Sequence, residues 1–282
     1  MNTKIALLVC WYGEYPWYFP YFIHTCGYNP TIDFFIISDN TEVIRNKPNN
    51  VQIVYHTIED LKMNFSKQLG FEVNIDKPYK LCDFKPAYGF LFQNIIQGYD
   101  FWGHIDLDIV FGDIRNFMTD ELLNNYDVIS SRHDYTAGYF TLYRNNTDCN
   151  CLFMQSKHYK YVFTHSDNFW FDEFGSLTGY KITADAIFNQ LKTLDNVFES
   201  MTFVVTRAQR NYGLRVFFDF IVIDGLPGKI KWKNGKIYYK DIYEAIFYHL
   251  IQFKKECKEK TILSPIPNEF FFTKNQILET LI

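Results

Sequence analysis

Residues 101–113 read FWGHIDLDIVFGD, an apolar run into which one histidine and three acids are set. In a strand over Phe101–Phe111, the period of two places His104, Asp106 and Asp108 on one face and the aliphatic residues between them on the other. Burying carboxylates in an apolar strand costs free energy unless a cation or hydrogen-bond donors compensate. Two carboxylates at a strand end form a hard oxygen site that suits Mg²⁺ or Mn²⁺. The alternative is an exposed strand terminus at which the acids meet water.

The chain before this stretch alternates between strand-like and helix-like segments. Short apolar runs predict three strands, at Lys4–Trp11, Ile32–Ser38 and Val51–Tyr55. Helices are predicted at Tyr15–Cys26 and at Ile58–Leu69, the second with Thr57 as its N-cap. Strands separated by helices form parallel sheets, which bind ligands beyond the carboxyl ends of their strands. We therefore expect an α/β protein with its site at that edge.

The rest of the chain is patterned less regularly. Further strands are predicted at Tyr126–Ser131, Gly138–Tyr143 and Arg215–Ile223. Further helices are predicted at Ala87–Gln97, 146–158 and 183–192. The sequence KNGK at 233–236 predicts a hairpin turn, whereas residues 241–255 fit either a helix or a strand. Because no repeat, low-complexity segment or Gly/Ser linker interrupts the chain, we expect one compact domain.

Composition and charge narrow the class of protein. With 282 residues, 48% apolar and 21% charged, the chain is globular and not disordered. Its net charge of −4 argues against a general nucleic-acid binder. Between Lys229 and Lys260, however, nine lysines stand against four acids, among several aromatic residues. This basic aromatic segment suits an anionic membrane surface or phosphate groups, and a solvated amphipathic helix is the alternative.

Cysteine and hydropathy patterns indicate the compartment. The six cysteines include no Cys-x-x-Cys pair and no zinc-type spacing, so we expect free thiols in a reducing compartment. The N-terminal apolar run Ile5–Cys10 is too short for a signal peptide, and no stretch approaches the ~18 apolar residues of a membrane-spanning helix. These patterns predict a cytoplasmic protein, either free or peripheral at the inner face of the cell membrane.

The Asp-x-Asp stretch and its surroundings resemble the GT-A glycosyltransferases. Residues 81–86 read LCDFKP and precede a helix, after which Gly98–Asp100 leads into the strand. This run is similar to one in bacterial and toxin sugar transferases, where a Ser-Asp pair before the helix reaches the nucleotide. The resemblance implies nucleotide contacts from Asp83 and Lys85, although Cys82 stands where the serine would be. It also implies a Rossmann-related, mostly parallel sheet flanked by helices, with a small C-terminal extension.

A second resemblance concerns His249 and Lys255, which lie six residues apart. This spacing is similar to the C-terminal His and Lys of the glycogenin-like transferases, in which the His completes the metal site and the Lys contacts the diphosphate. The resemblance implies that Asp106, Asp108 and His249 hold Mn²⁺ or Mg²⁺, with Asp106 and Lys255 also on the nucleotide. Such a cation would favour departure of the leaving group electrostatically. The alternative is a surface histidine on a helix with solvated lysines.

The resemblance assigns further residues. Asp172 and Glu173 follow an aromatic cluster, and such acidic pairs hold sugar hydroxyls or supply the base of inverting enzymes. A pair of acids at a helix N-terminus is the alternative. Trp11 and Tyr12 end the first strand, where GT-A enzymes place the nucleotide base, so a ring could stack there or fill the core. Asp39, after the second strand, could cap a turn or touch the nucleoside.

These features predict a metal-dependent glycosyltransferase that moves a hexosyl group from a nucleotide-sugar, most simply a UDP-sugar, to a saccharide. The resemblance to polysaccharide-cluster proteins implies capsule or O-antigen synthesis with a lipid-linked acceptor. We divide the expected catalytic domain into a nucleotide-binding half at 1–113, an acceptor half at 114–228 and the basic segment at 229–282. A non-catalytic carbohydrate- or nucleotide-binding module is the main alternative. An Asp-x-Asp phosphatase is less favoured, because its motif lies near the N-terminus and is followed by threonine.

Overall fold

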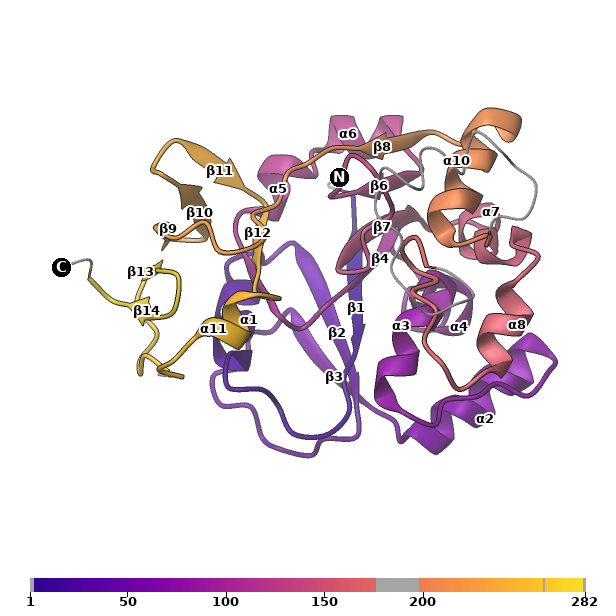
Figure 1. Ribbon diagram of the computed structural model, residues 1–282, viewed down its shortest axis with the longest axis horizontal. Coiled ribbons are helices and arrows are strands. Elements are labelled where there is room, and N and C mark those ends of the chain that lie inside the picture. Colours follow the sequence, from indigo (N-terminus) through magenta and orange to yellow (C-terminus); the bar gives the residue numbers. More distant parts are fainter. Residues whose placement is uncertain (1–2, 176–197, 261, 281–282) are drawn as a thin grey trace.

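Seven strands form the central sheet of the protein, in the order β3-β2-β1-β4-β7-β6-β8 (Figure 1). The computed structural model describes residues 3–175, 198–260 and 262–280. The strands are β1 Ile5–Cys10, β2 Ile32–Ser38, β3 Val51–Tyr55, β4 Phe101–Ile105, β6 Val128–Ser130, β7 Phe140–Arg144 and β8 Val216–Phe218. Four of the six neighbouring pairs are parallel, and β7 runs antiparallel to both β4 and β6. The expected α/β class with a mostly parallel sheet is confirmed.

Helices cover both faces of this sheet, as Figure 1 shows. One side carries α2 Ile58–Leu69, α3 Leu81–Phe84, α4 Tyr88–Leu91, α7 Thr147–Asn150, α8 Tyr159–Thr164 and α10 Met201–Tyr212. The other side carries α1 Phe19–Gly27, α5 Ile114–Phe117 and α6 Asp120–Asn125. Alternation along β1 explains the two cores, because Ala6 and Leu8 face one cluster while Leu7 and Val9 face the other. No helix within the described ranges has the length and apolar character needed to cross a bilayer.

Most short-range predictions are confirmed. The first three strands lie where the apolar runs predict them, with β2 and β3 matching to the residue. Helix α2 begins after Thr57, which accepts a hydrogen bond from the Asp60 N–H while the Asp60 carboxylate accepts one from the Thr57 N–H. The KNGK turn joins β9 Ile230–Lys233 to β10 Lys236–Tyr239, with Asn234 and Gly235 both at positive φ.

The prediction of one continuous strand over Phe101–Phe111 is wrong. Strand β4 ends at Ile105, and β5 Ile109–Phe111 leaves the central sheet to pair with β12 Phe247–His249. Asp106 and Asp108 therefore lie in the bend between two strands. His104 does not share their surroundings: it is fully buried within β4, and its Nδ1 lies 3.0 Å from the Gly138 carbonyl oxygen.

Two helix predictions also need correction. The helix predicted at Ala87–Gln97 is only the single turn α4, because the Leu91 carbonyl accepts a hydrogen bond from the Gln68 amide and the chain turns after Phe92. The helix predicted at 146–158 is α7 followed by the 3₁₀ turn η3 Leu152–Gln155. The helix predicted at 183–192 lies outside the described residues.

The C-terminal extension forms a small antiparallel sheet of its own. Its order is β11-β10-β9-β13-β14, with β11 Tyr243–Ala245, β13 Glu269–Phe272 and β14 Ile277–Leu278. Trp232 and Phe270 stack in this sheet and pack against Tyr21 and His24 of α1. Residues 241–255 are thus two short strands followed by α11 Phe253–Glu256, and this segment carries His249 back to the Asp-x-Asp bend.

Candidate active site

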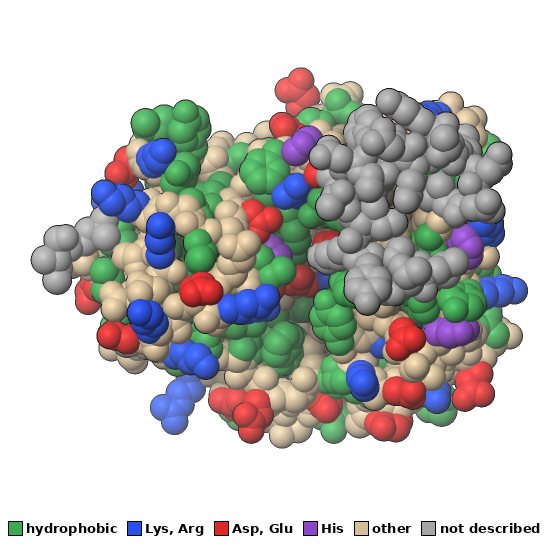
Figure 2. Space-filling model, viewed as in Figure 1, with side chains coloured by type: hydrophobic (Ala, Val, Ile, Leu, Met, Phe, Trp, Pro, Cys, Tyr) green, Lys and Arg blue, Asp and Glu red, His purple; other side chains and the backbone are tan. Residues whose placement is uncertain are grey.

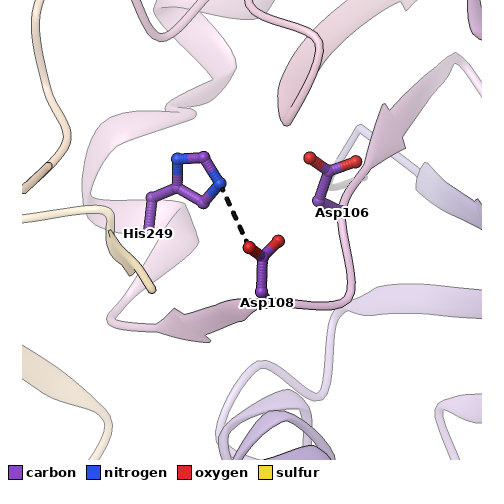
Figure 3. A group of neighbouring side chains, drawn as sticks. All are labelled: Asp106, Asp108 and His249. Carbon is purple, nitrogen blue, oxygen red and sulfur yellow. Dashed lines mark ion pairs between the residues drawn. The ribbon is translucent and has the colours of Figure 1, made fainter. Parts of the chain in front are cut away.

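Asp106, Asp108 and His249 meet beside the carboxyl end of β4. Because His249 pairs with Ile109 across β12 and β5, its side chain lies next to Asp108. The backbone bond from the Leu250 N–H to the Asp108 carbonyl oxygen, at 2.8 Å, fixes this register. One ligand atom from each of the three side chains lies within 4.8 Å of the others, and Figure 3 shows them pointing toward a common centre.

Cationic side chains hold both carboxylates. Asp108 accepts a hydrogen bond from Lys254 Nζ at 2.7 Å, and His249 Nε2 lies 3.5 Å from the same oxygen. Burial by itself would raise the pKa of Asp108, but His249 and Lys254 outweigh burial and hold the pKa below its usual range. Burial lowers the pKa of His249, yet Asp108 and Asp224 raise it to about 9. Asp106 pairs with Lys85 Nζ.

These three side chains fit a divalent cation of the Mn²⁺ or Mg²⁺ type. Two carboxylates and one imidazole supply hard oxygen and borderline nitrogen ligands. His249 is buried, and neither of its ring nitrogens has a hydrogen bond within the described residues. Each ring nitrogen faces one carboxylate oxygen at 3.5 Å, that of Asp108 or that of Asp224, which is too long for a strong hydrogen bond. A cation at Nε2 would therefore give this buried nitrogen a closer partner.

A cleft with two compartments surrounds the three residues. The strand-end compartment, of about 420 Å³, lies at the ends of β1 and β4 and is lined by Val9, Trp11, Tyr12, Tyr18, Asp108 and Lys254, among others. The acidic compartment, of about 450 Å³, is lined by Tyr135, Tyr139, Trp170, Asp172, Glu173 and Asp224, among others. Lys85, Asp106 and His249 border both. Figure 2 shows a hollow with acidic, histidine and hydrophobic side chains near the middle of one face.

Asp172 and Glu173 lie in the acidic compartment, within a turn and not at a helix N-terminus. Asp172 Oδ2 is 3.5 Å from Lys85 Nζ, and Glu173 Oε1 accepts a hydrogen bond from the Gly138 N–H at 3.3 Å. Burial raises the pKa of Asp172 well above its usual value. A β-carbon on Gly138 would lie 2.4 Å from the Asp172 carboxylate, so a larger residue here would force that carboxylate to move.

The structure brings some predicted nucleotide contacts into the cleft and not others. Trp11 and Tyr12 line the strand-end compartment, and Lys85 lines both compartments. Asp39 lies outside the described lining of the cleft and accepts a hydrogen bond from the Gly13 N–H at 3.0 Å, so it holds a turn. The structure therefore shows the turn-capping bond of Asp39, and its contact with a nucleoside stays a prediction.

Asp83 also departs from its predicted place. It is fully buried, pairs with Lys80 Nζ at 2.8 Å and accepts hydrogen bonds from the N–H groups of Phe169 and Phe171. Lys80 in turn donates to two carbonyl oxygens, those of Val162 and Asp167, at 2.6 Å each. Asp83 therefore anchors the loop that leads to the acidic pair and lies outside the described lining of the cleft.

The lysine that reaches the cleft is Lys254 and not Lys255. Adjacent helical positions are about 100° apart, so α11 directs only one of the two lysines toward Asp108. Lys254 contacts that carboxylate and lines the strand-end compartment, whereas Lys255 is exposed. The sequence interpretation selected Lys255 by its spacing from His249, whereas the lysine that lines the cleft in the structure is Lys254.

Sequence reasoning also missed Asp224 of the acidic compartment. Asp224 lies 3.5 Å from His249 Nδ1, and Tyr139 packs its ring against the imidazole at 4.3 Å. Asp224 follows an irregular segment after β8 and carries no local pattern that marks it. Asp224 directly precedes the sequence GLPG at 225–228 and could have been noticed only as a carboxylate at the end of an apolar run.

Comparison with known proteins places the chain in a family. It belongs to the family described as "Family of unknown function (DUF6625)", whose model matches residues 7–280. A search of the curated proteins finds no match.

Three solved structures are among those similar to this chain, and all are of glycosyltransferases. The galactosyltransferase LgtC, solved with donor and acceptor sugar analogues, is 14% identical, with a TM-score of 0.35 over 58% of this chain and 67% of its own. Mouse xyloside xylosyltransferase 1 is 8% identical, with a TM-score of 0.46 over 88% of this chain and 97% of its own. GlyE of Streptococcus pneumoniae is 9% identical, with a TM-score of 0.34 over 77% of this chain and 45% of its own.

Proposed function

We propose that this protein is a metal-dependent glycosyltransferase that transfers a hexosyl group from a UDP-sugar to a saccharide acceptor. The observation that carries the proposal is the meeting of Asp106, Asp108 and His249 at the border of two compartments beside a parallel-sheet edge. Ligands of open α/β sheets bind at this edge. When bound there, a divalent cation would supply positive charge that stabilises the leaving diphosphate.

The strand-end compartment suits the nucleotide. The rings of Trp11, Tyr12 and Tyr18 line it and offer flat apolar surfaces for a base. Lys254 borders the same compartment and could neutralise phosphate charge once the carboxylate of Asp108 turns to a cation. We therefore assign to Lys254 the role that the sequence resemblance gave to Lys255.

The acidic compartment suits sugars. Carboxylates of Asp172 and Glu173 accept hydrogen bonds from hydroxyl groups, and the ring of Trp170 offers an apolar face for C–H groups. In an inverting reaction, Asp172 would take the proton of the acceptor hydroxyl, because its raised pKa suits a general base. A lipid-linked acceptor, a role in capsule or O-antigen synthesis and contact of the basic segment with a membrane stay predictions.

Thermal unfolding with UDP and Mn²⁺ tests the proposal. A ligand at about 100 times its dissociation constant stabilises the folded state by about 2.7 kcal/mol, which raises the midpoint of a chain of this size by several degrees. We expect this rise with UDP plus Mn²⁺, and its loss in EDTA. Slow Mn²⁺-dependent release of UDP from a UDP-sugar would then separate an enzyme from a binding module. An equal rise with and without EDTA would contradict the cation site.

Two neighbouring lysines provide a matched test of the nucleotide side. We expect Lys254→Gln to weaken UDP binding at saturating Mn²⁺ by about 10- to 100-fold, since a hydrogen bond to a charged group contributes about 1.5–3 kcal/mol. Lys255→Gln removes the same charge from an exposed position and should leave the affinity within twofold. Isothermal titration calorimetry measures both. Equal losses in the two variants would indicate only a general charge effect.

A further inference from the structure

Asp224 lies behind His249, on the side of the imidazole away from the Asp-x-Asp bend. Its Oδ1 is 3.5 Å from His249 Nδ1, while His249 Nε2 is 3.5 Å from Asp108. Backbone bonds hold the two residues in register: the His249 N–H donates to the Ile223 carbonyl oxygen, and the Ile223 N–H donates to that of Phe247, both at 3.0 Å. The imidazole is thus set between two carboxylates, one on each nitrogen.

Arg132 fixes the second oxygen of Asp224. Its Nη1 is 3.7 Å from Asp224 Oδ2, and its other guanidinium nitrogens bind both oxygens of Asp134 at 2.9 and 3.0 Å. The guanidinium also lies over the rings of Tyr135 and Phe220. A cation held on three sides has little freedom, so it orients the Asp224 carboxylate with Oδ1 toward the histidine.

A carboxylate on one imidazole nitrogen determines what the other nitrogen can do. A histidine that binds a metal carries its proton on the remaining nitrogen, which donates to a carboxylate or carbonyl oxygen. With the proton on Nδ1 facing Asp224, the lone pair of Nε2 faces Asp106 and Asp108. The Tyr139 ring, 4.3 Å from the imidazole, limits rotation out of this position.

We propose that Asp224 is a positioning residue, which holds the Nδ1 proton of His249 so that Nε2 is directed to a divalent cation between Asp106 and Asp108. This inference rests on the cation site of the proposed function. It adds a partly buried chain, Arg132–Asp224–His249, in which Asp224 joins the lining of the acidic compartment to that site.

The test measures Mn²⁺ binding to the full chain, without nucleotide, from the electron paramagnetic resonance signal of free Mn²⁺. We expect Asp224→Ala to weaken Mn²⁺ binding about 10–100-fold, the usual effect of losing such an outer partner. Asp224→Asn keeps an oxygen that can accept a hydrogen bond from the Nδ1–H, so its affinity for Mn²⁺ should fall less than tenfold. Asp219→Asn, an exposed acid in the same segment, is the matched control and should bind as the unaltered chain does.

A second readout separates positioning from a general structural effect. With UDP-sugar as substrate, Asp224→Ala should raise the Mn²⁺ concentration for half-maximal rate, while the rate at saturating Mn²⁺ falls less than tenfold. Unchanged Mn²⁺ affinity in both Asp224 variants would overturn the inference and leave the proposed function intact, as would an affinity loss equal to that of Asp219→Asn. If the unaltered chain binds no Mn²⁺, the cation site of the proposed function fails first. Asp224→Asn keeps the comparison available should Asp224→Ala not fold.

Discussion

Replacing Asp106 or Asp108 by asparagine should abolish the Mn²⁺-dependent rise in unfolding temperature with UDP and lower sugar transfer at least about 100-fold. A cation at a leaving phosphate supplies several kcal/mol of stabilisation in the transition state, and about 1.4 kcal/mol corresponds to a factor of ten in rate. Both carboxylates belong to the three-residue cluster, so neither variant keeps the full ligand set. Calorimetric titration with Mn²⁺ and a UDP-release assay measure the two effects.

The two variants should differ in stability without ligand, which provides an internal check. Asp108 is buried against Lys254 and His249, whereas about a third of the Asp106 side chain is exposed. We therefore expect Asp108→Asn to lower the unfolding temperature of the free protein more than Asp106→Asn. Asp76→Asn, at an exposed acid outside the described lining of the cleft, is the control for loss of one negative charge. Full transfer activity in both site variants would refute the metal-site assignment.

Replacing Asp83 by alanine should destabilise the protein by about 3–5 kcal/mol, because it leaves the ammonium of Lys80 buried without its counter-charge. The side chains are 0% and 1% exposed, so water cannot replace the lost partner. Burial raises the pKa of Asp83 and lowers the pKa of Lys80. The attraction between the two charges acts in the opposite direction on each group. Urea denaturation measures the free energy of unfolding. Lys77→Met, at an exposed lysine three residues before Lys80, should change it by less than about 0.5 kcal/mol.

A double variant isolates the ion pair from the backbone bonds around it. Lys80→Met combined with Asp83→Asn removes both charges and keeps an oxygen for the N–H groups of Phe169 and Phe171. Lys80→Met and Asp83→Asn are the two single variants of this cycle. We expect the double variant to lose less stability than the sum of these two single losses, by about 0.5–3 kcal/mol, as for residues in contact. Strictly additive losses would mean that the pair is not coupled. Loss of the Asp83 anchor should also lower activity, since the loop beyond Phe171 carries Asp172.

Several local features of the fold could be predicted because they depend on neighbours in sequence. The apolar runs of β1, β2 and β3, the capping box of α2 at Thr57 and the KNGK hairpin are such features. The prediction of a helix at Ala87–Gln97 was wrong because this segment depends on contacts with residues that are distant in the sequence. Its apolar spacing is helical, but Gly89 packs against Trp102, and the Leu91 carbonyl oxygen bonds to Gln68. Such tertiary contacts outweigh a weak local preference.

Some residues of the candidate site could likewise be found from local sequence, and others could not. Asp106 and Asp108 could be singled out because charges inside an apolar run are costly and need a reason. His249 was reached only through a resemblance in spacing, and the same spacing selected Lys255 in place of Lys254. A shift of one residue in a short helix turns a side chain by about 100°, and no spacing rule resolves that without the helix axis.

The sequence by itself determined the α/β alternation and singled out the Asp-x-Asp pair and the pair Asp172 and Glu173, since periodicity and unexpected charge are local properties. Tertiary structure alone decided that β5 leaves the central sheet for β12, that Lys254 meets an acid 146 positions earlier in the chain, and that Asp224 stands behind His249. Tertiary structure also decided that Asp83 is buried in an ion pair with Lys80 and does not line the cleft. Pairing between distant segments depends on the packing of the whole chain, because each contact requires the surrounding elements to be in place.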